Sequence, residues 1–310
     1  MSAAPSLTLR IDPALAEAAV DRALTSGDST RPDALAGSRH RAEPLYGIAE
    51  PALRAAAFGR FALAEFEAMG LAEPILRAIA ERPGVAQRVR VALLGEARGR
   101  HDEGVTCEPQ GEHLGFRIEA SRFANPAAVL TWARHALGHA EDTLDPAFGF
   151  EPGWDEVGGA AAAAAAQARL HRLWDVSVDG RLAAAGHLAV ESARGRHRAA
   201  IGSDLRGVSE MAIEAVVARL WAGPRPTFPD LLDWATRPIA LVRALAPGEP
   251  GQPRPDRCPL CGFAADDVVP PATSVAALVN ADYPAWRPEH GLCGRCADRY
   301  RFAGRLGGPA

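Results

Sequence analysis

Apolar side chains recur at helical spacing in two stretches of the first hundred residues. Residues 51–69 have this spacing and predict an amphipathic helix, and residues 74–79 predict a second helix. Residues 14–36 are polar and rich in alanine, which predicts short helical stretches. The N-terminal part of the chain is therefore expected to be largely helical.

Two later segments alternate polar and apolar side chains, which is the period of a β-strand. Residues 88–94 include β-branched valines, and residues 113–123 alternate more strictly. Both are predicted to be strands, and residues 95–111 between them are predicted to form a loop. Asn125 is a good helix N-cap and Pro126 suits the first helical position, so a helix is expected to follow the second strand at once.

The second half of the chain is predicted to be mainly helical. Residues 160–178 are dominated by alanine, the residue of highest helix propensity, and Gly180 is expected to end that helix. Residues 209–221 and 229–245 predict two further helices. Residues 246–256 contain four prolines and two glycines, which predicts a stiff linker.

Together these elements predict an α+β protein, with a helical domain that contains a small mixed sheet and with a small C-terminal module. The predicted divisions are an N-terminal helical segment at 1–45, the α+β domain at 46–245, the linker at 246–256 and the module at 257–303.

Composition and charge indicate which cellular compartment and which partners are expected. The 310 residues are 48% hydrophobic, enough to bury a large core, and the net charge of −4 gives no drive toward nucleic acid or an anionic membrane. The chain has neither a signal-peptide pattern at its start nor an apolar run of about 18 residues. We therefore expect a cytoplasmic protein without disulfides, for which neither nucleic acid nor a membrane is the partner.

Four cysteines form two Cys-x-x-Cys pairs, Cys258 with Cys261 and Cys293 with Cys296. Two such pairs supply the four thiolates that structural zinc prefers in a closed tetrahedral shell. A small terminal segment would also gain much of its folding free energy from the metal. The segment resembles zinc-ribbon and treble-clef modules, which implies a structural Zn²⁺ and no particular activity.

His135 and His139 lie four residues apart in the helix predicted after Asn125, so both imidazoles point from one face. Two zinc ligands on one helix require this spacing. A second interpretation needs no metal, because the two histidines could form hydrogen bonds with nearby acids such as Asp142 in a polar core.

The predicted order of helix, strand, loop, strand and histidine helix resembles the core of the zincin metallopeptidases. In that family the edge strand of the sheet aligns a peptide beside the metal. The resemblance implies that His135 and His139 are zinc ligands. Ala136 departs from it, because zincins carry at this position the glutamate that activates the metal-bound water.

The third ligand of the histidine site is open among three aspartates. Asp175 is favoured, since some zincins take an acidic ligand from a downstream helix, and Asp179 lies one turn further along the same predicted helix. Asp145 lies six residues after His139, where metzincin-type motifs place a ligand. That motif requires a glycine at the position that Asp142 occupies here.

Two functions follow from this pattern. The first is a zinc-binding relative of the zincin metallopeptidases, impaired or inactive because it lacks the glutamate, and no catalytic residue is assigned. Glu141 is expected to point away from the metal, whereas Glu156 is in a loop and could approach it. The second is a non-enzymatic, zinc-dependent adaptor that binds a peptide or protein partner.

Overall fold

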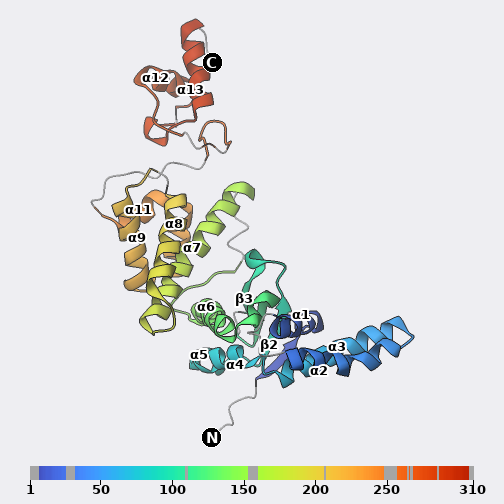
Figure 1. Cartoon of the computed structure of the whole chain (residues 1–310). Coiled ribbons are helices and arrows are strands. Elements are labelled where there is room, and N and C mark those ends of the chain that lie inside the picture. Colours follow the sequence, from blue (N-terminus) through green and yellow to red (C-terminus); the bar gives the residue numbers. More distant parts are fainter. Residues whose placement is uncertain are drawn as a thin grey trace. The chain divides into compact units, whose positions relative to one another are not determined.

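Thirteen α-helices and four short strands make up the part of the chain that the computed structural model describes (Figure 1). That part comprises residues 7–25, 32–108, 111–152, 160–205, 207–247, 257–263, 265, 268–284 and 286–306. The predicted α+β class is confirmed. Among the described residues, no helix is both long enough and apolar enough to span a membrane.

The chain divides into two compact units, which are described one at a time. The first contains Met1–Glu156, Ser177–Val190 and Arg225–Asp230, and the second contains Val157–Val176, Glu191–Pro224 and Leu231–Ala310.

The first unit contains a mixed four-stranded sheet. Its strands are β1 (Thr8–Ile11), β2 (Val91–Glu96), β3 (Gly104–Cys107) and β4 (His113–Ile118), and their order across the sheet is β1-β2-β4-β3. The β1-β2 and β2-β4 pairs are parallel, and β3 runs antiparallel to β4 at the edge. The two predicted strands are present as β2 and β4, but their bounds differ from the prediction: β2 begins at Val91, and β4 ends at Ile118 because Ala120–Ala124 form a 3-10 helix.

The prediction that residues 95–111 form a loop is wrong, because β3 lies inside this segment. Its four residues are too few for alternation to stand out in the sequence, and it forms only because β4 provides a partner. The short strand β1 was likewise not predicted.

Helices cover one face of the sheet, and α1 and α6 pack directly on its strands. The helices that precede α7 are α1 (Pro13–Thr25), α2 (Pro32–Ala42), α3 (Pro51–Ala68), α4 (Glu73–Ala80), α5 (Pro83–Ala86) and α6 (Pro126–Leu144). On the covered face, Ile11, Leu94, Phe116 and Val105 lie in register from β1 to β3. Leu94 and Phe116 are almost fully buried and belong to one large apolar core with side chains of α1, α3, α4 and α6. This core fixes α6 against the sheet.

The start of α6 is as predicted. The side chain of Asn125 accepts hydrogen bonds from the backbone N–H groups of Ala127 and Ala128, and Pro126 occupies the first helical position. The following helix α7 (Ala160–Ala184) extends beyond its predicted end. Gly180 lies inside it and is buried, and the chain turns instead at Gly186, whose φ of 74° suits glycine.

Four more helices follow α7. They are α8 (Val190–Asp204), α9 (Glu210–Ala222), α10 (Phe228–Thr236) and α11 (Pro238–Leu245). The helix predicted at 209–221 is present as α9, with the Ser209 hydroxyl accepting a hydrogen bond from the N–H of Ala212. The helix predicted at 229–245 is instead two helices. Pro238 disfavours a helical conformation at Arg237, which breaks the segment there.

The four cysteines lie in a small C-terminal module with two helices, α12 (Thr273–Asp282) and α13 (Gly294–Leu306). Its core is a separate small cluster that includes Val279, Trp286 and Tyr300 beside three of the cysteines. Residues 248–256 of the predicted linker lie outside the described residues, so the predicted domain boundaries stay a prediction.

Candidate metal centres

The four cysteine sulfurs converge in the C-terminal module. Their Sγ atoms all lie within 4.8 Å of one another, with 3.7 Å between Cys258 and Cys296 and 3.9 Å between Cys261 and Cys293. Two thiolates bound at about 2.3 Å to one tetrahedral ion lie about 3.8 Å apart. The group could therefore hold a metal ion with little movement.

The local chemistry of the cysteines favours a cation between them. Burial raises the pKa of Cys258, but hydrogen bonds from backbone N–H groups, of which that from Cys293 is the largest, lower it by more. The resulting pKa is about 7. Burial and the neighbouring thiols raise the pKa of Cys296 far above its ordinary value. Without a cation the four sulfurs cannot all be thiolates at neutral pH, and a bound metal ion would supply the missing positive charge.

A second group lies on α6 and α7. The Nε2 atoms of His135 and His139 are 3.2 Å apart, and their rings meet edge to face. One ring nitrogen of each histidine and a carboxylate oxygen of Asp175 all lie within 4.8 Å of one another. Nitrogen ligands about 2.0–2.1 Å from a tetrahedral zinc ion lie about 3.3 Å apart, so the spacing of the two histidines suits one ion.

Asp179 orients His135. Its carboxylate oxygen Oδ1 lies 2.6 Å from Nδ1 of His135, and Asp179 is only 7% exposed. When Nδ1 carries the proton, the Nδ1–H group donates a hydrogen bond to this carboxylate. The lone pair of Nε2 is then directed toward His139. This is the arrangement by which proteins fix the tautomer of a metal-binding histidine. Asp179, one of the three candidate third ligands, is therefore better placed to hold His135 than to bind the ion.

Asp145 is occupied elsewhere. Its carboxylate forms an ion pair with Arg225 and accepts the backbone N–H of Ala147 at 2.9 Å. The hydrogen bond from Arg225 contributes most to lowering the pKa of Asp145 below its ordinary value. The hydrogen bond from the Ala147 N–H contributes next. Among the described residues, the group that could hold a metal contains Asp175 and not Asp145.

Two features that the sequence pattern does not reveal hold α6 beside the second half of α7. The fully buried Asp142 accepts hydrogen bonds from both terminal nitrogens of Arg181, at 2.8 and 2.5 Å, and one from Arg225 at 3.1 Å. At Gly138, an added Cβ would lie only 2.5 Å from a methyl group of Val178. A glycine between the two histidines was the available signal, because it permits close helix packing.

Among the described residues, the glutamates close to His139 in sequence do not supply the missing general base. Ala136 itself is 3% exposed and belongs to the apolar core under the sheet. Glu141 forms an ion pair with Arg82. Glu156 lies outside the described residues.

Comparison with known proteins adds no assignment. No family model matches the chain, and no curated protein and no solved structure matches it either. The two groups of side chains that could hold metal ions are therefore the features from which a function can be inferred.

Proposed function

We propose that this chain is a zinc-binding protein with two sites of different kinds. A structural Zn²⁺ at the four cysteines would stabilise the C-terminal module. A second Zn²⁺ would bind His135, His139 and Asp175 in a zincin-like arrangement that no longer cleaves peptides. The observation that carries this proposal is the 3.2 Å approach of two Nε2 atoms, with Asp179 holding the other ring nitrogen of His135.

The ligand set supports an open second site. Two histidines and one aspartate give three protein ligands, and zinc sites of this kind leave a fourth position for water or another ligand. General-base help contributes about 10²–10⁴-fold in enzymes that use it. With the buried Ala136 at the glutamate position, the centre can bind a ligand at the metal but lacks that acceptor for the proton of a bound water.

A second candidate function is an adaptor that holds an extended peptide. In its favour, β3 ends the sheet, and its outer side pairs with no strand among the described residues. α6, the helix that bears the histidines, packs against β3. A peptide added along this edge would gain backbone hydrogen bonds beside the sheet that α6 packs against, without any bond being cut.

The test is total zinc content together with peptidase activity. Purified protein is expected to hold two zinc ions per chain, and His139→Ala is expected to hold one. The matched control is His171→Ala, because His171 is exposed on α7 and lies outside the ligand group. It should keep both ions.

Peptidase assays with casein and with a peptide library distinguish both proposed functions from an active peptidase. Neither should be cleaved by the zinc-loaded protein. Chelator-sensitive cleavage that disappears in His139→Ala would show an active peptidase and refute the loss of hydrolysis. A single ion that persists in His139→Ala would refute the histidine site and leave only the cysteine site.

A further inference from the structure

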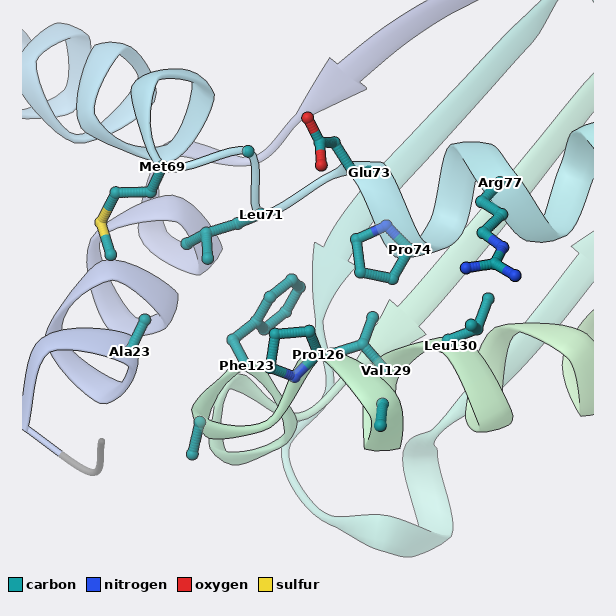
Figure 2. Close-up of a pocket in the computed structure, with 13 residues that line it drawn as sticks. Ala23, Met69, Leu71, Glu73, Pro74, Arg77, Phe123, Pro126, Val129 and Leu130 are labelled. Carbon is teal, nitrogen blue, oxygen red and sulfur yellow. The ribbon is translucent and has the colours of Figure 1, made fainter. Parts of the chain in front are cut away.

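A cavity of about 730 Å³ lies in the first unit, at the N-terminal end of α6 (Figure 2). Its lining residues on α6 precede the two histidines, so it is separate from the proposed metal centre. Most of its lining is apolar and comes from α1, the turn between α3 and α4, α4, α6 and the short helix before α6: Ala23, Met69, Leu71, Pro74, Phe123, Pro126, Val129 and Leu130. Its size and lining are typical of small-molecule sites.

The polar groups of the cavity come from α4. Arg77 extends from α4 across the cavity toward Leu130, whereas the carboxylate of Glu73 is directed away from Pro126 and Val129 (Figure 2). An anionic group at the Arg77 end of the cavity would therefore meet the guanidinium before it met Glu73.

The positive charge of Arg77 is only partly neutralised. Arg77 donates from Nε to Glu81 at 3.1 Å, but both oxygens of Glu81 also accept hydrogen bonds from Arg134 at 2.7 Å. The hydrogen bond from Arg134 is the main cause that lowers the pKa of Glu81 to about 2, so this carboxylate is ionised at neutral pH. Two guanidinium groups thus share one carboxylate, and the terminal nitrogens of Arg77 form no hydrogen bond with a described residue.

We propose that this cavity binds a small aliphatic carboxylate. The apolar tail would occupy the space above Phe123 and Val129, which are 2% and 1% exposed, and the carboxylate would accept hydrogen bonds from Arg77. Met69 at the edge has the flexible side chain needed to fit tails of different shape. This site does not depend on the metal centre and extends the protein's function beyond zinc.

Calorimetric titration with octanoate tests the proposal, with uncharged octanol and tailless acetate as companion ligands. Octanoate is expected to bind more tightly than either. Arg77→Gln is expected to weaken octanoate binding roughly fivefold, since the side chain of Arg77 is 66% exposed and solvent screens the pair. It should leave octanol binding unchanged.

Two variants make the result specific. Arg60→Gln on α3 removes the same charge from an exposed arginine outside the lining and should not alter octanoate binding. Ala127→Leu places a larger side chain at an exposed lining position and should abolish it without disturbing the core.

Three results would overturn the proposal. They are no octanoate binding at millimolar concentration, equal affinities for octanoate and octanol, and equal octanoate affinities for Arg77→Gln and the unchanged protein. A dimer in light scattering that Ala127→Leu dissociates would also overturn it, because the cavity would then be an interface between two copies.

Discussion

The two candidate metal centres join residues similarly far apart in the chain but are formed in opposite ways. The separation is 38 positions between Cys258 and Cys296, and 44 between His135 and Asp179, the residue that orients it. The cysteines lie in two short knuckles around a small apolar cluster and offer four ligand atoms. The histidines lie on a helix that a large core already fixes, and with Asp175 they offer three.

The two centres differ in the relation between metal binding and folding. In the C-terminal module few side chains are available to bury, so a bound ion would supply most of the folding free energy. In the first unit α6 packs against the sheet through a large apolar core and against Val178 of α7 at Gly138, and this packing places the ligand atoms. At the cysteine centre a bound ion would stabilise the fold, whereas at the histidine centre the fold positions the ligand atoms.

The largest expected effect comes from removing two cysteines. Cys258→Ser with Cys293→Ser should release one zinc ion and unfold residues 257–306, because structural zinc contributes about 10–16 kcal/mol in small modules. The sheet and α6 should remain folded. Hydrogen exchange of both regions, with zinc analysis, measures this, and simultaneous loss of protection in both would contradict the distinction between the centres.

Asp179→Asn addresses the orientation of His135. Loss of the carboxylate that accepts the Nδ1 proton should weaken metal binding at the histidine site about 10–100-fold and leave the cysteine site unchanged. Competition titration with a chromophoric chelator measures both affinities. The control is Asp204→Asn, which removes a carboxylate paired with Arg172 of α7 but outside the ligand group. Equal affinities in the two variants would show that Asp179 has no special role.

Gly138→Ala tests whether the histidine site depends on close helix packing. The new Cβ would overlap Val178, which costs about 1–3 kcal/mol, while alanine returns up to about 1 kcal/mol of helix propensity. We expect a net loss of about 1 kcal/mol in urea unfolding. The double variant Gly138→Ala with Val178→Ala should recover part of it.

The control for that series is Gly195→Ala in α8, where an added Cβ would meet nothing within 4 Å. It should be neutral or stabilising. If Gly138→Ala behaved in the same way, α6 and α7 would not be in close contact at that position.

The smallest expected effect is on the pH dependence of unfolding. Arg134, the neighbour of His135 in sequence, holds the folded-state pKa of Glu81 at about 2, below its ordinary value of 4.5. A depressed carboxyl pKa contributes stability that is present above pH 4.5 and lost as the pH falls toward 2. In Glu81→Gln the urea midpoint, measured in chelator, should change less over this range, and an unchanged dependence would contradict the role of this pair.

The sequence predicted local features well. The helix of the two histidines was predicted to its first residue because Asn125 and Pro126 encode its start. The convergence of the cysteines followed from spacing, since a Cys-x-x-Cys knuckle places two sulfurs together by itself. Strands β2 and β4 followed from their alternation.

Features that depend on a partner segment were missed. β3 is too short to be predicted without β4, and the continuation of α7 past Gly180 to Ala184 depends on packing that leaves Gly180 buried. The role of Asp179 was also hidden. Helical spacing places Asp175 and Asp179 on one face, but only the relation between α6 and α7 shows which one meets Nδ1 of His135.

The burial of Ala136 has a consequence for anyone who wishes to give this protein a reaction. A glutamate there would have to place its carboxylate among the apolar side chains under the sheet, which costs several kcal/mol unless the charge is neutralised. Ala136→Glu alone should therefore lower stability and create no peptidase. Redesign would have to begin by opening the core beside the helix, since packing and not metal chemistry is the obstacle.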